Sequence, residues 1–390
     1  MKNKNSLLDA VTGGVLLRHG GEASVYLLNV GGSSYVLKWY GNGFSFDEQV
    51  VERASSVRDA GLYRIEEWGR RNETPYLIYD YIAGVSSDRL SRMPVAVALF
   101  ALRQVASTLA VLRKQGVSHG DLNPANVILA LDGLSGLKGE SKSGKNGGFR
   151  TVVIDCGIVG PGALAYAAPE RFQGKRPDEK SDLFSLGLLL YRWIAGEDLV
   201  KAGGYEQFAE QMANIDSLDV SEKLYSTGAF DGPDAASQLS ALTPLWKGLL
   251  CADADERVED LDELDELLEI ALGKVCCGEV ALATGVAHFI ESENLLNVAR
   301  KVPEGAGISL PFVAQKKKNR LKWGILGVLV FILILLALLL SSGTMSFGID
   351  ATGDLLLKRS RNMETSTEVE KAPNLKVDSL LLELPVPTVK

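Results

Sequence analysis

The chain has 390 residues, of which 46% are hydrophobic and 23% are charged, and these are the proportions of a globular protein with a full core. Its formal net charge of -8 argues against a general nucleic-acid-binding surface, because contacts with phosphate groups require a basic face. The four cysteines (Cys156, Cys251, Cys276 and Cys277) lack the spaced pairs of a zinc site, so we expect reduced thiols in a cytosolic domain.

Residues 11–80 have the pattern of a β-rich lobe. Short apolar runs at 25–27 and 35–38 follow glycine pairs, and a further strand is expected at 76–79. A short helix is predicted at 47–57, between the second and third of these runs.

From residue 95 onward the pattern becomes helical. Apolar residues recur at three- and four-residue steps between Val97 and Leu112, which predicts a helix with one buried face. More helix is expected over 181–195 and 235–272, and an apolar stripe within 276–300 predicts packing against this helical part. The chain therefore predicts an α+β fold, with a strand-rich lobe followed by a helical lobe.

A segment of different composition interrupts the helical part. Residues 133–149 are dominated by glycine, serine and lysine, too polar and too glycine-rich to pack into a core. We interpret them as a flexible insertion in a hairpin.

A strongly apolar segment lies near the C-terminus. Residues 324–340 contain no charged side chain, and with the flanking residues they define a predicted transmembrane helix at 323–342. At about 1.5 Å per residue such a helix is roughly as long as a bilayer core is thick. The chain would thus contact the lipid bilayer through a single helix.

The charges beside this helix predict its orientation. Five basic residues lie between 316 and 322, whereas the first charges after the helix are Asp350 and Asp354. Basic flanks remain in the cytoplasm, so residues 1–322 are expected inside, including a juxtamembrane segment at 273–322. The tail at 343–390 is then expected outside.

The strongest chemical signal surrounds Asp121 and Asn126. An aspartate followed five residues later by an asparagine suits phosphoryl transfer, because a carboxylate must accept the proton of an attacking hydroxyl while an amide oxygen holds Mg²⁺. Downstream, a buried strand at 152–154 ends at Asp155, where a carboxylate could bind the metal that bridges the phosphates of ATP.

These segments resemble the catalytic loop and the metal-binding motif of eukaryotic-type Ser/Thr protein kinases, which are widespread in bacteria. The resemblance covers residues 11–272. It implies a bilobal protein-kinase-like fold, with a small lobe at about 11–80 and a large lobe at about 83–272. It also assigns Asp121 as the catalytic base, with Asn126 and Asp155 as the metal ligands.

The resemblance implies further roles in the small lobe. Gly20 matches the central glycine of the loop that covers the ATP phosphates, and Lys38 matches the lysine that contacts them. Val25 and Val36 would sandwich the adenine ring.

Two other parts of the nucleotide site follow from the same resemblance. Residues 77–84 resemble the hinge, where backbone groups of Asp80 and Ile82 would bond the base and Tyr79 would border its pocket. The helix glutamate that pairs with the lysine is either Glu48 or Glu52, and Glu52 is preferred because Glu48 leaves less chain between strand and helix.

Motifs in the second half favour a protein kinase over a small-molecule kinase. Residues 162–170 resemble the end of an activation segment, and Asp182 matches the aspartate that holds the backbone of the catalytic loop. Arg257 lies where the family places a buried partner of Glu170.

Three positions depart from the family pattern. Gly120 replaces the arginine beside the catalytic aspartate, Asn123 replaces a lysine that steadies the γ-phosphate, and Ala163 replaces a threonine that bonds the aspartate.

The predicted function is transfer of the γ-phosphoryl group of ATP, with Mg²⁺, to Ser or Thr of cytoplasmic protein substrates by a membrane-anchored signalling kinase. The alternatives are a nucleotide-binding pseudokinase scaffold at the membrane and, less favoured, a small-molecule phosphotransferase. A second copy of the chain is a further conceivable partner.

Overall fold

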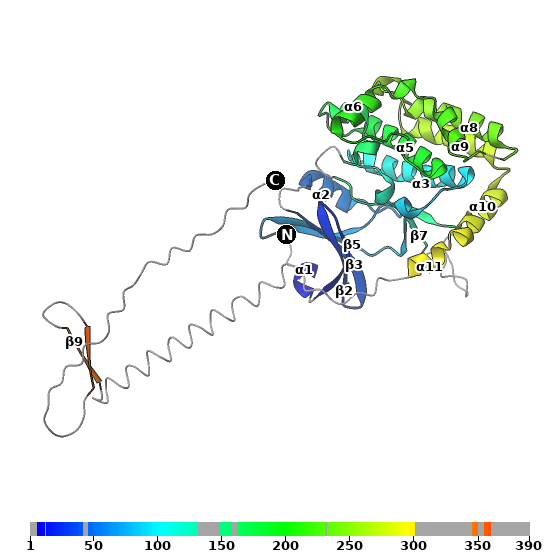
Figure 1. Ribbon diagram of the computed structural model, residues 1–390. Helices are drawn as coiled ribbons and strands as arrows, with labels where there is room; N and C mark the ends of the chain where they lie inside the picture. Colours follow the sequence, from blue (N-terminus) through cyan, green and yellow to red (C-terminus); the bar gives the residue numbers. More distant parts are fainter. Residues whose placement is uncertain are drawn as a thin grey trace, which may run out of the picture. The chain divides into compact units, whose positions relative to one another are not determined.

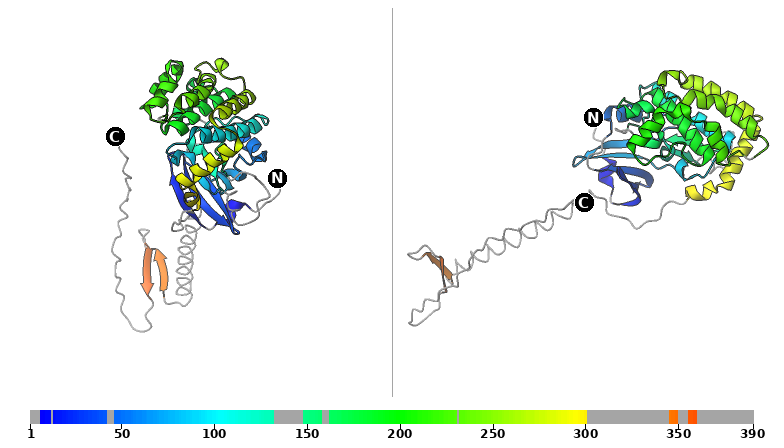
Figure 2. Two further views of the ribbon diagram at one scale, coloured as in Figure 1. Left: turned by 90° about the vertical axis from the view of Figure 1, so that its right-hand side faces the viewer. Right: turned by 45° about the horizontal axis from the view of Figure 1, so that its top comes forward.

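The computed structural model describes residues 6–300 except for 12, 42–45, 132–147, 158–161 and 231, together with two short strands near the C-terminus. The chain divides into two compact units, residues 1–312 and 313–390, and each is described by itself. Within the first unit, the strands and the helices form the two lobes expected from the sequence (Figures 1 and 2).

The small lobe is built on one five-stranded antiparallel sheet in the order β1-β2-β3-β5-β4. Its strands are β1 (Gly14–His19), β2 (Ala23–Val30), β3 (Ser33–Tyr40), β4 (Ile65–Arg71) and β5 (Thr74–Asp80). Because side chains alternate across a strand, Val36, Lys38 and Tyr40 share one face of β3. In the register of the sheet, Val25 of β2 is directly opposite Lys38.

Two helices accompany this sheet. The short α1 (Leu7–Ala10) precedes it and buries Leu8, and α2 (Glu48–Ser56) lies between β3 and β4. The Asp47 carboxylate caps α2 by accepting the backbone N–H groups of Gln49 and Val50 at 3.0 and 3.3 Å. The helix therefore begins within one residue of its predicted start.

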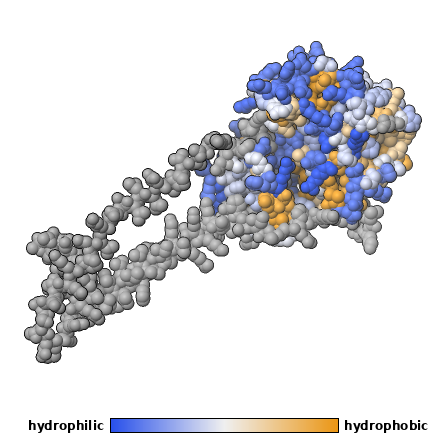
Figure 3. All heavy atoms as spheres, viewed as in Figure 1, coloured by the Kyte–Doolittle hydropathy of each residue, from blue (hydrophilic) through white to orange (hydrophobic). Residues whose placement is uncertain are grey.

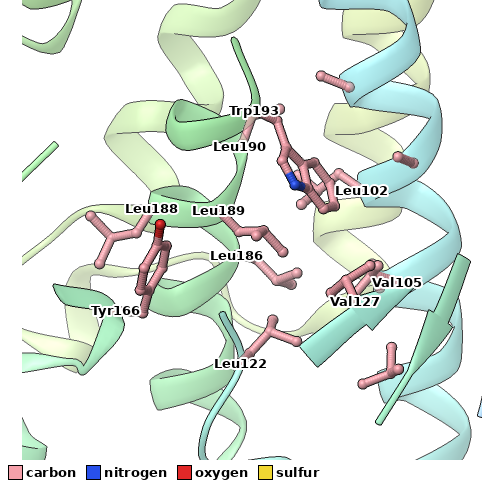
Figure 4. Packing of buried hydrophobic residues seen from close by; sticks show 14 of the residues in the cluster. Leu102, Val105, Leu122, Val127, Tyr166, Leu186, Leu188, Leu189, Leu190 and Trp193 are labelled. Carbon is pink, nitrogen blue, oxygen red and sulfur yellow. The ribbon is translucent and has the colours of Figure 1, made fainter. Parts of the chain in front are cut away.

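The large lobe is helical. Its helices are α3 (Val95–Arg113), α4 (Pro169–Phe172), α5 (Glu179–Ala195), α6 (Tyr205–Ala213), α7 (Val220–Ser226), α8 (Ala235–Leu249) and α9 (Leu261–Val275). Between them lie the short helical turns η1 (Ser87–Arg89), η2 (Pro124–Asn126), η4 (Leu164–Tyr166), η5 (Ile215–Ser217) and η6 (Ala254–Glu256). Side chains from α3, such as Leu102, and from α5, such as Leu186 and Trp193, point into one core (Figure 4).

A small three-stranded sheet lies beside this core, in the order β6-β7-β8. Its strands are β6 (Gly84–Ser86), β7 (Val127–Ala130) and β8 (Arg150–Val153). Most of the predicted insertion falls between β7 and β8, outside the described residues. The predicted flexible insertion extends too far, because its last residue, Phe149, is only 5% exposed. The centroid of its ring lies 5.7 Å from that of Phe100 and 6.4 Å from that of Phe289.

Two more helices follow the predicted end of the large lobe. They are α10 (Glu279–Ser292) and α11 (Leu295–Arg300), and they contact α3 and β6 respectively. Phe289 and Leu295 are each 2% exposed, so this part of the predicted juxtamembrane segment packs on the kinase-like domain. Val280, at 82% exposed, does not.

The predicted transmembrane helix at 323–342 lies outside the described residues. Of the described helices, α3 is long and apolar enough to cross a membrane, as is the bent pair of α9 and α10 if read as one span. The side chains of α3 are mostly buried in the large lobe, as those of a core helix are. The second unit contains an antiparallel hairpin of β9 (Met345–Ile349) and β10 (Leu355–Arg359).

On the face of the first unit seen in Figure 3, hydrophilic residues surround scattered hydrophobic ones.

Candidate active site

The pairing of β7 with β8 brings the two predicted metal-binding residues together. The strands are antiparallel, with Val127 opposite Val153, so the residue before β7 lies beside the residues after β8. Ile154 N–H donates to the Asn126 carbonyl at 3.0 Å. Asn126 and Asp155 are therefore neighbours although 29 positions separate them in the chain.

The Asp121 carboxylate lies next to Asn126 and is held by three donors. The side-chain amide of Asn126 donates to Oδ2 at 2.9 Å, while the Ala163 backbone N–H donates to Oδ1 at 2.7 Å. The Asn123 amide reaches the same Oδ1 at 3.2 Å. Because Ala163 uses its backbone, the loss of a threonine hydroxyl at this position leaves the aspartate with a hydrogen bond from the activation segment.

Asn123 also stabilises the backbone of the catalytic loop. Its side-chain oxygen accepts the Ala125 N–H at 2.9 Å and caps the turn η2, on which Asn126 lies. Asn123 is 8% exposed, so in this arrangement it orders the loop around Asp121.

The backbone of the catalytic loop is anchored from α5. The Asp182 carboxylate accepts the N–H groups of His119 and Gly120 at 2.7 and 2.9 Å, as the family resemblance implies. Burial holds the pKa of Asp182 above its ordinary value, although the charge of His119 and these two N–H groups oppose this shift. His119 Nε2 lies 2.8 Å from the Ile154 carbonyl, which ties the loop to the strand before Asp155.

The two carboxylate oxygens of Asp155 differ in their partners. Its Oδ2 forms a 2.8 Å ion pair with Lys38 Nζ, whereas its Oδ1 is a buried acceptor without a partner among the described residues. Burial alone would lower the pKa of Lys38, but Asp155 holds it above its ordinary value. Lys38 is thus a buried cation fixed beside Asp155.

The unpartnered Asp155 oxygen makes the site compatible with Mg²⁺. The Asn126 amide nitrogen is used by Asp121, so its oxygen is the group left for a metal. One carboxylate and one amide oxygen suit an ion that completes its shell with phosphate oxygens and water. Asn126 and Asp155 would hold this ion, and it would neutralise charge on the phosphates.

The remaining predicted nucleotide residues lie in the small lobe and in the connection that follows it. Val25 and Val36 lie on the face of the sheet that carries Lys38, and Val36 pairs with Tyr79 across β3 and β5. Ile82 lies in the connection after β5, and Gly20 lies in the turn between β1 and β2, where its N–H donates to the Ala23 carbonyl. The Asp80 N–H donates to the Arg64 carbonyl at 3.2 Å, so this predicted base-binding group is already used within the sheet.

In this structure the predicted helix glutamate does not pair with Lys38. Lys38 pairs with Asp155, and Glu52 is exposed on the outer face of α2. Glu48 is exposed too, and its partner is Arg70 at 3.3 Å. The reason is the register of α2, which turns Val51 (0% exposed) toward the core.

The predicted pair of Glu170 and Arg257 is present deep in the large lobe. Two parallel bonds of 2.8 Å join the guanidinium to the carboxylate, and the Arg257 side chain is completely buried. Burial would raise the pKa of Glu170, but the Arg257 guanidinium holds it below its ordinary value.

Sequence reasoning missed two residues that shape the site. Gly162 has a φ of +71°, and a Cβ there would lie 2.4 Å from Asp121 Oδ1. The chain passes so close to the catalytic carboxylate that no other residue fits. Tyr40 carries its ring 5.2 Å from Lys38 Nζ. Its position two residues after Lys38 was the available signal, because such residues share a strand face.

Comparisons with known proteins agree with this geometry. The family model described as "Protein kinase domain" matches residues 48–268. The serine/threonine-protein kinase pkn2 of Myxococcus xanthus is 28% identical over 56% of this chain and 26% of its own length. Aurora kinase of Schizosaccharomyces pombe is 30% identical over 49% of this chain and 52% of its own length. The chain therefore spans a quarter to about half of these relatives.

A solved structure is also similar. The kinase domain of Mycobacterium tuberculosis PknI aligns with a TM-score of 0.47 and 19% identity, over 67% of this chain and 95% of that one. The family model covers more than half of the chain, including the catalytic loop, Asp155 and the buried Glu170–Arg257 pair. This chain belongs to the protein kinase family.

Proposed function

We propose that the chain is a protein kinase that transfers the γ-phosphoryl group of ATP to Ser or Thr of protein substrates. The observation that carries this proposal is the Asp121 carboxylate, which accepts hydrogen bonds from the Ala163 backbone and from Asn126, the neighbour of Asp155. Family membership supports it, since the similar protein pkn2 is named as a serine/threonine-protein kinase.

In the proposed reaction, Asp121 accepts the proton of a substrate hydroxyl as its oxygen attacks the γ-phosphorus. The bond from that phosphorus to the bridging oxygen breaks, and ADP leaves with the electron pair. Lys38 would bind phosphate oxygens, and Asn126 and Asp155 would hold Mg²⁺. The protein contributes positioning and charge, which dominate catalysis of phosphoryl transfer.

A nucleotide-binding pseudokinase is the second candidate. Two features favour it. The Lys38–Asp155 ion pair occupies the carboxylate that the metal needs, and Glu52 is exposed instead of pairing with Lys38. Against it stands the ordered Asp121, for which a scaffold has no need. A small-molecule phosphotransferase is less favoured, because the Glu170–Arg257 pair belongs to the protein-kinase pattern.

The proposal is tested by incubating the full chain with Mg²⁺, γ-labelled ATP and a mixture of proteins, followed by analysis of the phosphorylated amino acids. Phosphoserine or phosphothreonine is expected. Binding of ATP without labelled protein would favour the pseudokinase, and label confined to small molecules would favour the phosphotransferase.

We also propose that residues 323–342 anchor the kinase in a membrane, with residues 1–322 in the cytoplasm and 343–390 outside. The support is the uncharged run at 324–340 and the basic residues before it. Substrates would then be cytoplasmic, and two copies could associate through the membrane helix. A cysteine introduced at position 350 should react with an impermeant reagent in intact cells, whereas one at 142 should not. The reverse result would overturn this topology.

A further inference from the structure

The surroundings of Lys38 raise the question of what holds its ammonium group in place. In this structure its ionic partner is Asp155, at 2.8 Å. Asp155 is also the proposed metal ligand, and a carboxylate that binds Mg²⁺ attracts a lysine less strongly. The glutamates of α2 point away. A partner that persists when nucleotide and metal bind must therefore be a group other than Asp155 and the glutamates of α2.

The ring of Tyr40 meets this requirement. Lys38 and Tyr40 lie two residues apart on β3 and share its face, which brings Nζ to 5.2 Å from the ring centroid. This distance is within the range of about 6 Å for cation–π attraction. Lys38 is 7% exposed and Tyr40 2% exposed, so water weakens the attraction little.

The ring is held rigidly where it lies. It packs against Phe46 with the centroids 5.7 Å apart, and Phe46 in turn meets Trp68 edge-on at 6.1 Å. The Tyr40 hydroxyl is buried and has no hydrogen-bond partner among the described residues. The hydroxyl therefore contributes little that phenylalanine would not, and the aromatic face is the part that acts on Lys38.

An aromatic partner has a consequence that a carboxylate partner lacks. The ammonium group of lysine carries three N–H donors, and a carboxylate takes at least one of them. An aromatic face attracts the positive charge as a whole through its quadrupole. With Tyr40 behind it, Lys38 keeps its donors for Asp155 in the free protein and for phosphate oxygens in the complex.

We propose that Tyr40 is the positioning residue for Lys38, in the role that the sequence assigned to Glu52. This inference rests on the proposed binding of ATP. Asp155 holds Lys38 in the free protein, but without the ring Lys38 would be left unsupported once Mg²⁺ engages Asp155. Ordering this long side chain against the phosphates would then weaken binding by roughly three- to tenfold. The loss would concern phosphate binding and spare the adenosine part of the nucleotide.

The test compares the dissociation constants of Mg·ATP and of adenosine for the full chain by calorimetry. Tyr40→Phe should bind both ligands as the wild type does, whereas Tyr40→Leu should lose three- to tenfold in ATP affinity and keep its affinity for adenosine. Tyr63 provides a matched control: it is also 2% exposed, its hydroxyl has no partner among the described residues, and its ring packs edge-on against Tyr79. Tyr63→Leu should change the affinities for both ligands by the same factor.

A fluorinated phenylalanine at position 40 separates charge from shape, because fluorine weakens the negative face of the ring and leaves its size nearly unchanged. This protein should fold as Tyr40→Phe does and still bind ATP selectively more weakly, which keeps the test informative if Tyr40→Leu does not fold. An unchanged ratio of ATP to adenosine affinity in the leucine and fluorinated proteins would overturn the role of Tyr40. A wild-type protein that binds no ATP would overturn the proposed function as well.

Discussion

The buried pair of Glu170 and Arg257 offers a demanding test of the packing of the large lobe. Arg257 donates to both oxygens of Glu170 at 2.8 Å, to the Cys251 carbonyl at 3.0 Å and to the Lys180 carbonyl at 2.8 Å. Its guanidinium also lies 4.8 Å from the Phe184 ring. Replacing Arg257 by Met would leave the carboxylate buried and uncompensated. Losing one partner of a buried pair typically costs about 3–5 kcal/mol in the free energy of unfolding.

The assay is urea unfolding of the full chain, followed by the fluorescence of the tryptophans buried in the large lobe. Arg103 supplies the matched control, because it forms the same bidentate arrangement with Asp265, at 2.7 and 2.9 Å, on the surface. Side-chain exposures of 37% and 46% place that pair in the class worth about 0–1 kcal/mol. If Arg257→Met costs no more than Arg103→Met, the assignment of the buried pair as a structural anchor is refuted.

The same pair predicts a pH dependence. Because Arg257 holds the pKa of Glu170 below its ordinary value of 4.5, the ionised carboxylate stabilises the fold above pH 4.5. This contribution is lost as the pH falls through the lower folded-state value. Glu170→Gln should therefore be less stable than the wild type at neutral pH, and the difference in unfolding free energy should shrink below pH 4.5. A difference that is constant with pH would contradict the direction of the shift.

Two further pairs of substitutions test the surroundings of Asp121 and of Lys38. Gly162→Ala should abolish most phosphoryl transfer, because the new Cβ would collide with the catalytic carboxylate. Its control is Gly174→Ala, at a φ of +80° with open space around it, which should lower thermal stability but retain activity. Equal activity of the two proteins would refute the collision. Glu52→Gln should leave the dissociation constant for ATP, measured by calorimetry, unchanged, whereas Lys38→Met should raise it. A comparable rise in both proteins would show that Glu52 is the partner of Lys38.

The sequence predicts the lobes and the catalytic loop well, because these depend on short-range patterns. The helix expected from Val97 to Leu112 appears as α3, and its recurring apolar residues are the buried ones. Asp121, Asn126 and Asp155 lie within motifs whose spacing is set by one hairpin, so their proximity follows once β7 and β8 pair.

The contacts that cross between elements could not be predicted in the same way. The partner of Lys38 depends on the rotation of α2, and one residue of rotation decides whether Glu52 or Val51 faces inward. The hydrogen bond from Ala163 to Asp121 uses a backbone N–H, which every residue except proline carries. The residue type at this position therefore does not predict it. The replacement of a threonine by Ala163 therefore removes a hydroxyl, while the backbone N–H of Ala163 still donates to Asp121.

The central claim is that Asp121 acts as the base in phosphoryl transfer while the rest of the cleft binds ATP. The most direct measurement compares kcat and the dissociation constant for Mg·ATP of the wild type and Asp121→Asn. A general base contributes about 10²- to 10⁴-fold to a rate, so kcat should fall by a factor in this range with ATP affinity nearly unchanged. Transfer by Asp121→Asn at the rate of the wild type would contradict the account.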